Sequence, residues 1–327
     1  KKIGFNDSSG GIAASGGTLS NLNALIAARN NAGLGSNPNS VLLISEDAHS
    51  SFIKCIRIMG LDAANLVRIK TDNQGRMDIN NLRKSLNKCL IENKKIFAIV
   101  ATLGTTVRGA IDPIKEISEI CKERNIWLHI DGSIGGIFAL SSIQIEGLNN
   151  INQANSITIN PQKIIGITKT SSLLLVANMN TLQKTFSTGL PYISSKEDIV
   201  NRGEIGIQGS RPAEVIKLWL GLRFLGLNGI EDILKSSIKR KDFFIDHIVK
   251  NKFEIYSGPL HIVSFIPKGL TTKDTDFWTQ TKVNELMKNN FMLSRPKFKG
   301  KYFLRVVMGN YNTKESHIED LLSLLDA

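Results

Sequence analysis

Two residues of complementary chemistry follow two segments that have the pattern of buried strands. Asp131 ends the apolar segment Ile126–Asp131, and Lys163 comes shortly after the apolar segment Ser156–Ile159. A lysine can form a Schiff base with an aldehyde, and an acid beside a pyridinium nitrogen keeps it protonated, so that the ring accepts electrons. Pyridoxal phosphate (PLP) needs both groups. The pair therefore indicates a PLP site, although an Asp at a strand end is often a helix cap and a Lys after proline is usually a surface charge.

The N-terminal region offers a turn that could bind the phosphate of such a cofactor. Gly10–Thr18 is rich in small residues and is expected to be a flexible loop, whereas Leu19–Asn30 has apolar residues at helical spacing. The free N–H groups and the positive end of a helix attract phosphate. We therefore expect Ser15–Thr18 to be an anion site, although a tight turn with a Ser or Thr cap would have the same pattern.

Strand-like and helix-like segments alternate through the first half of the chain. The expected strands are Val41–Ser45, Leu66–Ile69, Ile96–Ala101 and Ile126–Asp131. The expected helices are Phe52–Met59, Met77–Leu90 and one with Asp112 as its N-cap and Pro113 at its first position. This alternation predicts an α/β fold with a mostly parallel sheet and helices on both faces. His49 would then lie just past a carboxyl strand end, where such sheets bind ligands, although a lone His there is often a cap or a surface residue.

The second half of the chain has a different order of elements. We expect a strand at Leu173–Ala177 that returns to the sheet, followed by a polar, turn-rich connection at Asn178–Gln208. The remaining expected elements are helices Ala213–Phe224 and Ile230–Val249 with a break at Gly226–Gly229, strands Ile262–Ile266 and Tyr302–Val307, and a helix Thr313–Leu325. This order predicts a large domain over residues 1–232 and a small α+β domain over residues 233–327.

Composition narrows the class of protein. The 327 residues carry a formal charge of +12, but the lysines are dispersed and only 6% of residues are aromatic, so a solvated basic surface is favoured over a nucleic-acid surface. No apolar run approaches a membrane span, and no signal peptide is visible. Three cysteines without CxxC spacing argue against a metal site or disulfides and for the cytoplasm. Because the chain begins without Met, we expect an N-terminal segment to be missing.

Together the motifs resemble the group II PLP-dependent amino-acid decarboxylases, a family that includes the aromatic-amino-acid, glutamate, cysteine-sulfinate and diaminobutyrate decarboxylases. The resemblance covers nearly the whole chain in matching order and spacing. Its motifs are Ser15–Asn21, Ala48–Ser50, Ala101–Thr106, His129–Asp131, Asn160–Lys163, Gly209–Pro212 and the strand at Leu304-Arg305. It implies the PLP-dependent transferase-like fold (fold type I), with a large domain and a small C-terminal α+β domain.

The resemblance implies roles for the residues at the centre of the site. Lys163 would form the Schiff base, Asp131 would bind the pyridinium nitrogen, and His49 would stack on the cofactor ring. Gly17 and Thr18 would hold the phosphate.

Further residues are implied at the edge of the site. Asn160 would assist at the phosphate, and Thr102 and Ser133 would line the ring. Arg305 matches a position that reaches the substrate's carboxylate in some members. Family members are homodimers with the active site at the subunit interface, and Ser210 would contact the partner's cofactor phosphate.

Two departures from the family pattern concern proton transfer. Gln162 stands where the family usually has a His; it can still donate a hydrogen bond to a phosphate but cannot transfer protons. The family also usually has a long mobile loop that, in several members, brings in a tyrosine as proton donor, and here the stretch from Tyr192 to Gln208 is short. The proton donor is therefore left open.

The predicted function is PLP-dependent decarboxylation of an L-amino acid to its amine and carbon dioxide. The alternatives are another PLP reaction on the same fold, such as that of another lyase, an aldolase or an aminotransferase, and a cofactor-binding protein that has lost its activity. Gln162 and the short connection are the reasons to keep the last alternative. The expected partners are an amino acid as the small-molecule substrate and a second copy of the chain, with no nucleic acid, membrane or metal. Arg305 and the basic balance favour an acidic substrate.

Overall fold

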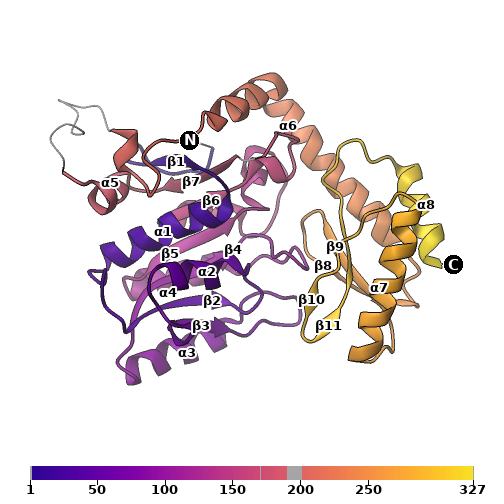
Figure 1. Ribbon diagram of the computed structural model, residues 1–327, viewed down its shortest axis with the longest axis horizontal. Coiled ribbons are helices and arrows are strands. Elements are labelled where there is room, and N and C mark those ends of the chain that lie inside the picture. The colour runs from indigo at the N-terminus through magenta and orange to yellow at the C-terminus, as the bar shows by residue number, and fades with distance from the viewer. Residues whose placement is uncertain (1, 170, 190–200, 327) are drawn as a thin grey trace.

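A seven-stranded sheet runs through the larger part of the molecule (Figure 1). The computed structural model describes residues 2–169, 171–189 and 201–326. The strands lie in the order β1-β7-β6-β5-β4-β2-β3. Their bounds are β1 (Gly10–Ala14), β2 (Ser40–Ser45), β3 (Leu66–Ile69), β4 (Lys95–Thr102), β5 (Trp127–Gly132), β6 (Ser156–Ile159) and β7 (Ser172–Val176). Strands β3, β2, β4, β5 and β6 are parallel, and β7 is antiparallel to both of its neighbours, so the predicted mostly parallel sheet is confirmed.

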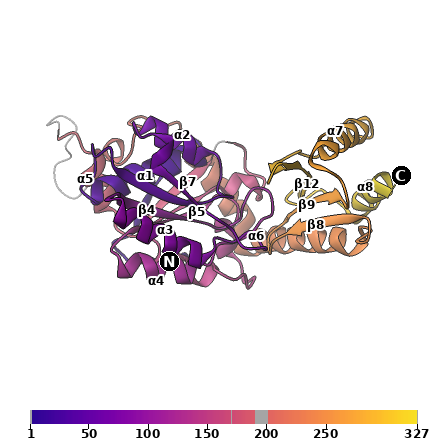
Figure 2. The same cartoon turned by 90° about the horizontal axis from the view of Figure 1, so that it is seen from below.

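Helices cover both faces of this sheet (Figure 2). They are α1 (Gly17–Asn31), α2 (Ser51–Ile58), α3 (Ile79–Ile91), α4 (Ile114–Glu123) and α5 (Asn180–Phe186). Along β2, Leu42 and Ile44 pack in the cluster of α1 and α2, whereas Val41 and Leu43 pack in the cluster of α3 and α4. A strand that is buried on both faces needs apolar residues at every position, which explains the uninterrupted apolar sequence of β2.

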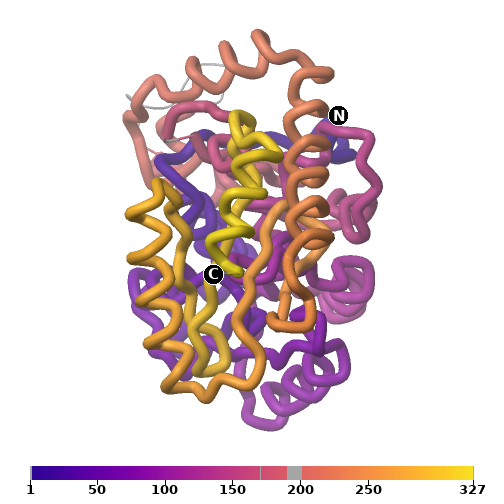
Figure 3. Tube along the Cα trace, turned by 90° about the vertical axis from the view of Figure 1, so that its right-hand side faces the viewer, coloured from indigo at the N-terminus to yellow at the C-terminus, as the bar shows by residue number. Residues whose placement is uncertain are grey.

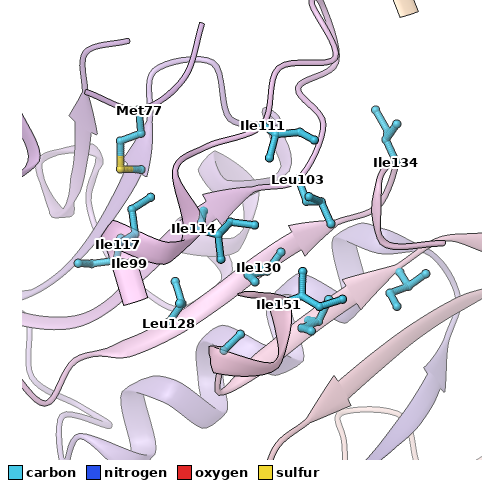
Figure 4. Packing of buried hydrophobic residues seen from close by; sticks show 14 of the residues in the cluster. Met77, Ile99, Leu103, Ile111, Ile114, Ile117, Leu128, Ile130, Ile134 and Ile151 are labelled. Carbon is cyan, nitrogen blue, oxygen red and sulfur yellow. The ribbon is translucent and has the colours of Figure 1, made fainter. Parts of the chain in front are cut away.

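The core between the sheet and α4 holds the central strands in register (Figure 4). Ile99 of β4 and Leu128 and Ile130 of β5 pack there with Ile114 and Ile117 of α4, and each is at most 1% exposed. Complete burial of a side chain of this size contributes roughly 1.5–3 kcal/mol. A shift of either strand would lose several such contributions, so the carboxyl ends of β4 and β5 keep their relative position.

A smaller part follows in the chain and contains its own sheet. Three antiparallel strands lie in the order β12-β9-β8, beside a two-stranded hairpin. The elements are β8 (Phe253–Ser257), β9 (Ile262–Pro267), α7 (Thr272–Lys288), β10 (Lys297–Phe298), β11 (Lys301–Tyr302), β12 (Leu304–Val307) and α8 (Glu315–Asp326). Its core includes Phe244, Phe265, Leu286, Leu304 and Ile318. In Figure 3, α8 lies between α7 and the second half of α6 on the face turned to the viewer.

The helix α6 (Glu214–His247) connects the two parts. Gly226 interrupts it with φ 61° and ψ −178°, a conformation that glycine adopts readily, so the predicted break at Gly226–Gly229 is confirmed. Beyond the kink, Ile230 and Leu234 pack in the core of the larger part, and Phe244 packs in the core of the smaller part.

The predicted flexible loop at Gly10–Thr18 is wrong in its first half, because Gly10–Ala14 forms the edge strand β1 paired with β7. Gly10 and Gly11 permit β1 to lie close to other segments of the same chain. A Cβ on Gly11 would lie 2.4 Å from the carbonyl oxygen of Leu174, and one on Gly10 would lie 2.6 Å from Sδ of Met179. Small residues therefore mark a packing constraint here and not flexibility.

The predicted N-cap role of Asp112 is also wrong. The N-cap of α4 is Pro113, and no side chain caps this helix. The Asp112 carboxylate instead accepts hydrogen bonds from the backbone N–H groups of Met77 and Thr102. The carboxylate therefore pairs two backbone donors, those of Met77 and Thr102, and does not cap α4.

Three other expectations differ from the structure. The connection Asn178–Gln208 contains α5 among its described residues, and Tyr302–Val307 is divided between β11 and β12. Strand β8 and helix α7 were not expected, although Thr271 and Asp274 form a capping box that marks the start of α7 in the sequence.

Candidate active site

A cavity of about 200 Å³ opens at the carboxyl ends of β4, β5 and β6. It is lined by Gly17, Thr18, Asn21, His49, Ser51, Thr102, Gly104, Thr106, Asp131, Ser133, Ile134, Asn160 and Lys163. Parallel strands end at the same edge of a sheet, and here Thr102 and Asp131 are paired neighbours in β4 and β5. The predicted residues that the structure brings together are Gly17, Thr18, His49, Thr102, Asp131, Ser133, Asn160 and Lys163.

Asp131 is the buried carboxylate of the cavity, with only 3% of its surface exposed. Its Oδ1 accepts a hydrogen bond from the backbone N–H of Ser133 at 3.1 Å, and its Oδ2 accepts one from Nδ2 of Asn21 at 3.2 Å. Since a carboxylate has about four acceptor positions, Asp131 can also accept an N–H from a bound cation.

Lys163 lies in the 3₁₀ turn Pro161–Lys163, which follows β6 directly. The surrounding protein partly desolvates the amine of Lys163, which keeps some exposure, and this desolvation lowers its pKa; Asp131 opposes this effect, and the positive charge of Arg305 adds to it. A lysine with a lowered pKa is more often neutral, and the neutral amine is the form that attacks a carbonyl. The environment therefore suits Schiff-base formation.

His49 lines the same cavity and keeps part of its ring exposed. Its Nδ1 accepts a hydrogen bond from the backbone N–H of Ser51 at 3.2 Å, which places the proton of the neutral ring on Nε2. The surrounding protein lowers the pKa of His49 by desolvation, although Asp131 raises it. An exposed, neutral and fixed imidazole can stack on a planar ring.

The start of α1 forms the other end of the cavity. No side chain caps this helix. A Cβ on Gly17 would lie 2.6 Å from Nδ2 of Asn160 and 2.9 Å from Oγ of Ser133, so only glycine fits. Ser172 donates its hydroxyl to Oδ1 of Asn160 and thereby leaves the amide N–H groups directed toward Gly17. The helix end, the Ser133 hydroxyl and the Asn160 amide are donors suited to a phosphate.

Two buried hydroxyl groups in the cavity test whether PLP fits. Oγ1 of Thr102 and Oγ of Ser51 are inaccessible to solvent and have no hydrogen-bond partner within the protein. Both residues line the cavity, one beside the carboxylate and one beside His49. Buried polar groups are normally paired. A ligand with hydrogen-bonding groups at both places, as PLP has, would satisfy them, so the residues present fit this cofactor.

Comparison with known proteins decides the family. Residues 2–266 match the family described as "Pyridoxal-dependent decarboxylase conserved domain". The chain belongs to this family. Membership confirms the predicted family, PLP as the cofactor and amino-acid decarboxylase as the class of enzyme.

Curated relatives of this decarboxylase act on chemically different amino acids. The chain is 30% identical over 335 residues to the aromatic-L-amino-acid decarboxylase of Bacillus atrophaeus, with 99% of this chain and 70% of that protein covered. It is 29% identical over 345 residues to the acidic amino acid decarboxylase GADL1 of Mus musculus, with 97% of this chain and 62% of that protein covered. The chain therefore spans 62–70% of the length of these two relatives.

Solved structures share the fold. Mouse CSAD superposes with a TM-score of 0.89 at 26% identity, over 99% of this chain and 72% of the other. Oryza sativa TDC, solved with PLP and tryptamine, superposes with a TM-score of 0.91 at 20% identity, over 99% of this chain and 72% of the other, which shows the fold alone. The predicted fold class is thereby confirmed. Within residues 2–169, 171–189 and 201–326, no helix has the length and apolar character needed to cross a bilayer.

Three predicted site residues do not line the cavity, namely Gln162, Ser210 and Arg305. Gln162 lies in the turn before Lys163, where its Oε1 is buried without a hydrogen-bond partner. Ser210 is exposed. Tyr192, the residue at the start of the short connection, lies outside the described residues.

Arg305, the third of these residues, is tied to the wall of the cavity. Its Nη1 donates to the carbonyl oxygen of Thr106, and its Nε donates to Oγ of Ser294 at 2.8 Å. The Ser264 hydroxyl donates to the next carbonyl oxygen, that of Val107. Since Thr106 lines the cavity, the smaller part of the molecule braces the loop after β4. This is a role for Arg305 that sequence reasoning missed.

Sequence reasoning also missed the roles of Asn21 and His129. Asn21 lines the cavity and bonds to Asp131, and His129 lies behind Asn21. Both residues lie within motifs of the family, Ser15–Asn21 and His129–Asp131, but a motif does not show which side chains form hydrogen bonds with one another. The sequence signal for this role was a polar His within an apolar segment that has the pattern of a buried strand. His129 is indeed fully buried, and a buried polar group requires hydrogen-bond partners.

Proposed function

We propose that the full-length protein converts an L-amino acid to its amine and carbon dioxide at this cavity, with Lys163 as the attachment point of PLP. One observation carries the proposal. A lysine and a carboxylate from two strand ends line the same small cavity as an uncapped helix N-terminus. These three features match the aldehyde, the ring nitrogen and the phosphate of PLP.

Bound PLP supplies an electron sink for the pair of electrons left by the departing carboxyl group. The protein residues would orient the cofactor and stabilise its charged groups. Asp131 would accept the ring N–H, and His49 would stack on the ring. Gly17 and Thr18 at the helix start, with Asn160 and Ser133, would bind the phosphate. Fixed orientation of the substrate decides which bond breaks.

A proton must reach the substrate carbon after carbon dioxide leaves. His49 lines the cavity and would supply this proton only as the imidazolium, a form that desolvation disfavours because it lowers the pKa of His49. Gln162 cannot take the role, since an amide does not exchange protons in this way. A tyrosine from the connection at Tyr192 remains a prediction that the described residues do not test.

The nature of the substrate side chain follows less directly. Relatives at nearly equal identity are described as aromatic and as acidic amino acid decarboxylases. Arg305 supports an acidic substrate by its charge near Lys163, but its guanidinium also holds the loop at Thr106. We propose an acidic amino acid as the first substrate to test.

We further propose a cytoplasmic homodimer with the active site at the interface. The exposed position of Ser210, outside the cavity of its own chain, supports a contact with the partner's cofactor phosphate. The free, buried cysteines Cys55, Cys89 and Cys121 suit a reducing compartment. We also propose a division into two domains, residues 1–232 and 233–327. The change of core along α6 supports two domains, although it lies between Leu234 and Phe244, slightly after the proposed boundary.

The proposal is tested by trapping the cofactor on the full-length protein. After incubation with PLP and reduction with borohydride, peptide mapping should place the pyridoxyl group on Lys163. Lys163→Ala should abolish the label, whereas Lys169→Ala, which changes an exposed lysine outside the cavity, should retain it. A label on another lysine, or none, would refute the assignment.

The reaction is tested separately with a panel of acidic and aromatic amino acids. Stoichiometric amine and carbon dioxide are expected. Keto acid or aldehyde without carbon dioxide would show another PLP reaction on this fold. Lys163 labelling without turnover of any amino acid would show that activity has been lost.

A further inference from the structure

Four buried polar side chains lie in a row behind Asp131, and the proposed reaction does not use them directly. Trp127 and His129 belong to β5, Ser156 belongs to β6, and Asn21 belongs to α1. Each is at most 7% exposed. Polar groups at this depth in a hydrophobic core are costly unless all of them are paired.

The four side chains are joined to one another and to Asp131 by consecutive hydrogen bonds. Nε1 of Trp127 donates to Oγ of Ser156 at 2.8 Å, and the same oxygen lies 2.8 Å from Nδ1 of His129. Nε2 of His129 lies 3.1 Å from Oδ1 of Asn21. Nδ2 of Asn21 donates to Oδ2 of Asp131 at 3.2 Å. The backbone register, which pairs His129 with Ser156, supports this alignment.

The groups at the two ends determine the direction of every bond. An ionised Asp131 can only accept, so Asn21 must present its N–H₂ to it and its carbonyl oxygen to His129. His129 must then carry its proton on Nε2, and Nδ1 must accept from the hydroxyl of Ser156. At the far end, the indole N–H of Trp127 can only donate, and it donates to a free lone pair on Oγ of Ser156. Both ends therefore require the same arrangement.

We propose that these four side chains form a directed row of hydrogen bonds that holds Asp131 oriented to accept the ring N–H of the cofactor. This inference rests on the proposed role of Asp131. Asn21, His129, Ser156 and Trp127 are positioning residues, because they act on the cofactor through Asp131.

The hydrogen-bonded row requires His129 to stay neutral. Burial lowers the pKa of His129 to about 4, and the nearby charge of Asp131 opposes this shift without cancelling it. Replacement of His129 by an apolar ring would leave Oδ1 of Asn21 without a donor. The amide could then rotate and direct its oxygen at the carboxylate, which would remove an N–H from Asp131 and weaken its hold on the ring proton.

The first test uses the full-length protein without cofactor. Nitrogen NMR of ¹⁵N-histidine-labelled protein should show His129 as the neutral Nε2–H tautomer, without titration between about pH 5 and pH 8. The His129→Phe variant assigns the signal. A charged ring, or the Nδ1–H tautomer, would overturn the proposed direction.

The second test reads the ring nitrogen of bound ¹⁵N-labelled PLP. His129→Phe should move this signal toward the unprotonated position and lower kcat by about 10- to 100-fold, with a smaller change in KM, as partners that orient a functional group from behind often do. His129→Gln, whose amide can accept one bond and donate another, should recover part of both effects. Thr158→Val is the matched control, because Thr158 lies on β6 with Ser156 and its buried hydroxyl has no hydrogen-bond partner.

The outcomes separate the hydrogen-bonded row from the proposed function. Failure of the borohydride label at Lys163 would refute the cofactor assignment. A label at Lys163 together with an unshifted ring-nitrogen signal in His129→Phe would refute the role of the hydrogen-bonded row alone. Equal losses in His129→Gln and His129→Phe, with the ring nitrogen still protonated in both, would show that His129 only fills space.

Discussion

The buried carboxyl group of Asp112 should make the stability of this protein depend on pH. Asp112 is 1% exposed and accepts backbone hydrogen bonds from Met77 at 2.6 Å and from Thr102 at 2.7 Å. Burial raises its pKa from 3.8 to about 7, and the two N–H donors reduce this shift. Because Thr102 lines the cavity, the state of this carboxyl group also bears on the site.

The size of the effect follows from the two pKa values. The folded protein binds the proton of Asp112 more tightly than the unfolded chain by about 3 pKa units, and each unit corresponds to about 1.4 kcal/mol. The protonated acid therefore contributes at most about 4 kcal/mol, fully present below about pH 4. This contribution is lost as the pH rises through about 7, because the unfolded chain then releases the proton more readily.

Asp112→Asn removes the titration and keeps the shape. Its N–H₂ must face one of the two backbone donors, so the free energy of unfolding should fall by about 1–3 kcal/mol at low pH. The assay is urea unfolding of cofactor-free protein at pH 4.5, 6 and 8. The free energy of unfolding of the parent protein relative to that of Asp112→Asn should fall by about 3 kcal/mol across this range, so the variant should be as stable as the parent protein at pH 8, or more stable.

A matched control and a clear contrary result complete this test. Asp232→Asn changes an exposed carboxylate of α6 and should follow the parent protein at every pH. If the difference between the parent protein and Asp112→Asn is the same at pH 4.5 and pH 8, Asp112 does not titrate in this range. The argument from burial would then be wrong.

Three further predictions concern single side chains. Asp131→Asn should lower kcat by several orders of magnitude, at about 1.4 kcal/mol per tenfold, and weaken PLP binding much less; near-normal kcat would make Asp131 a structural residue. Arg108→Met removes one partner of a buried ion pair with Asp47, in which the side chains are 4% and 5% exposed, so urea unfolding should show a fall of about 3–5 kcal/mol in the free energy of unfolding. Arg83→Met, in an exposed pair with Glu123, should lower it by under about 1 kcal/mol, and equal falls would contradict the argument from burial. Arg305→Met removes a charge that lowers the pKa of Lys163, so labelling of Lys163 by an amine reagent should shift to higher pH, and an unchanged profile would refute the coupling.

Much of the site was predictable because the carboxyl ends of parallel strands bring functional side chains together at one edge of the sheet. Asp131 and Lys163 each follow a short apolar strand, and parallel strands place their carboxyl ends together. The glycine-rich turn before α1 has the composition that a phosphate site needs. The sequence therefore predicted the sheet, the cofactor and most residues that line the cavity.

Elements whose local pattern is ambiguous were not predictable. Gly10–Ala14 has the small residues of a loop and becomes a strand only because β7 lies beside it. Helix α7 is polar over most of its length, so its helical spacing gives a weak signal. In both cases packing against distant residues overrides local preference.

The sequence by itself determined the class of fold and the cofactor, because these depend on residue type and on the order of strands and helices, and Lys163 as the attachment point stays a prediction. Only the tertiary structure decided what Arg305, Asp112 and His129 do. Arg305 braces a loop about 200 positions away, Asp112 serves the backbone of Thr102 instead of a helix end, and His129 stands in a row that ends at Asp131. The physical reason is that a buried polar group is defined by the partner that satisfies it, and that partner is chosen by packing across the chain.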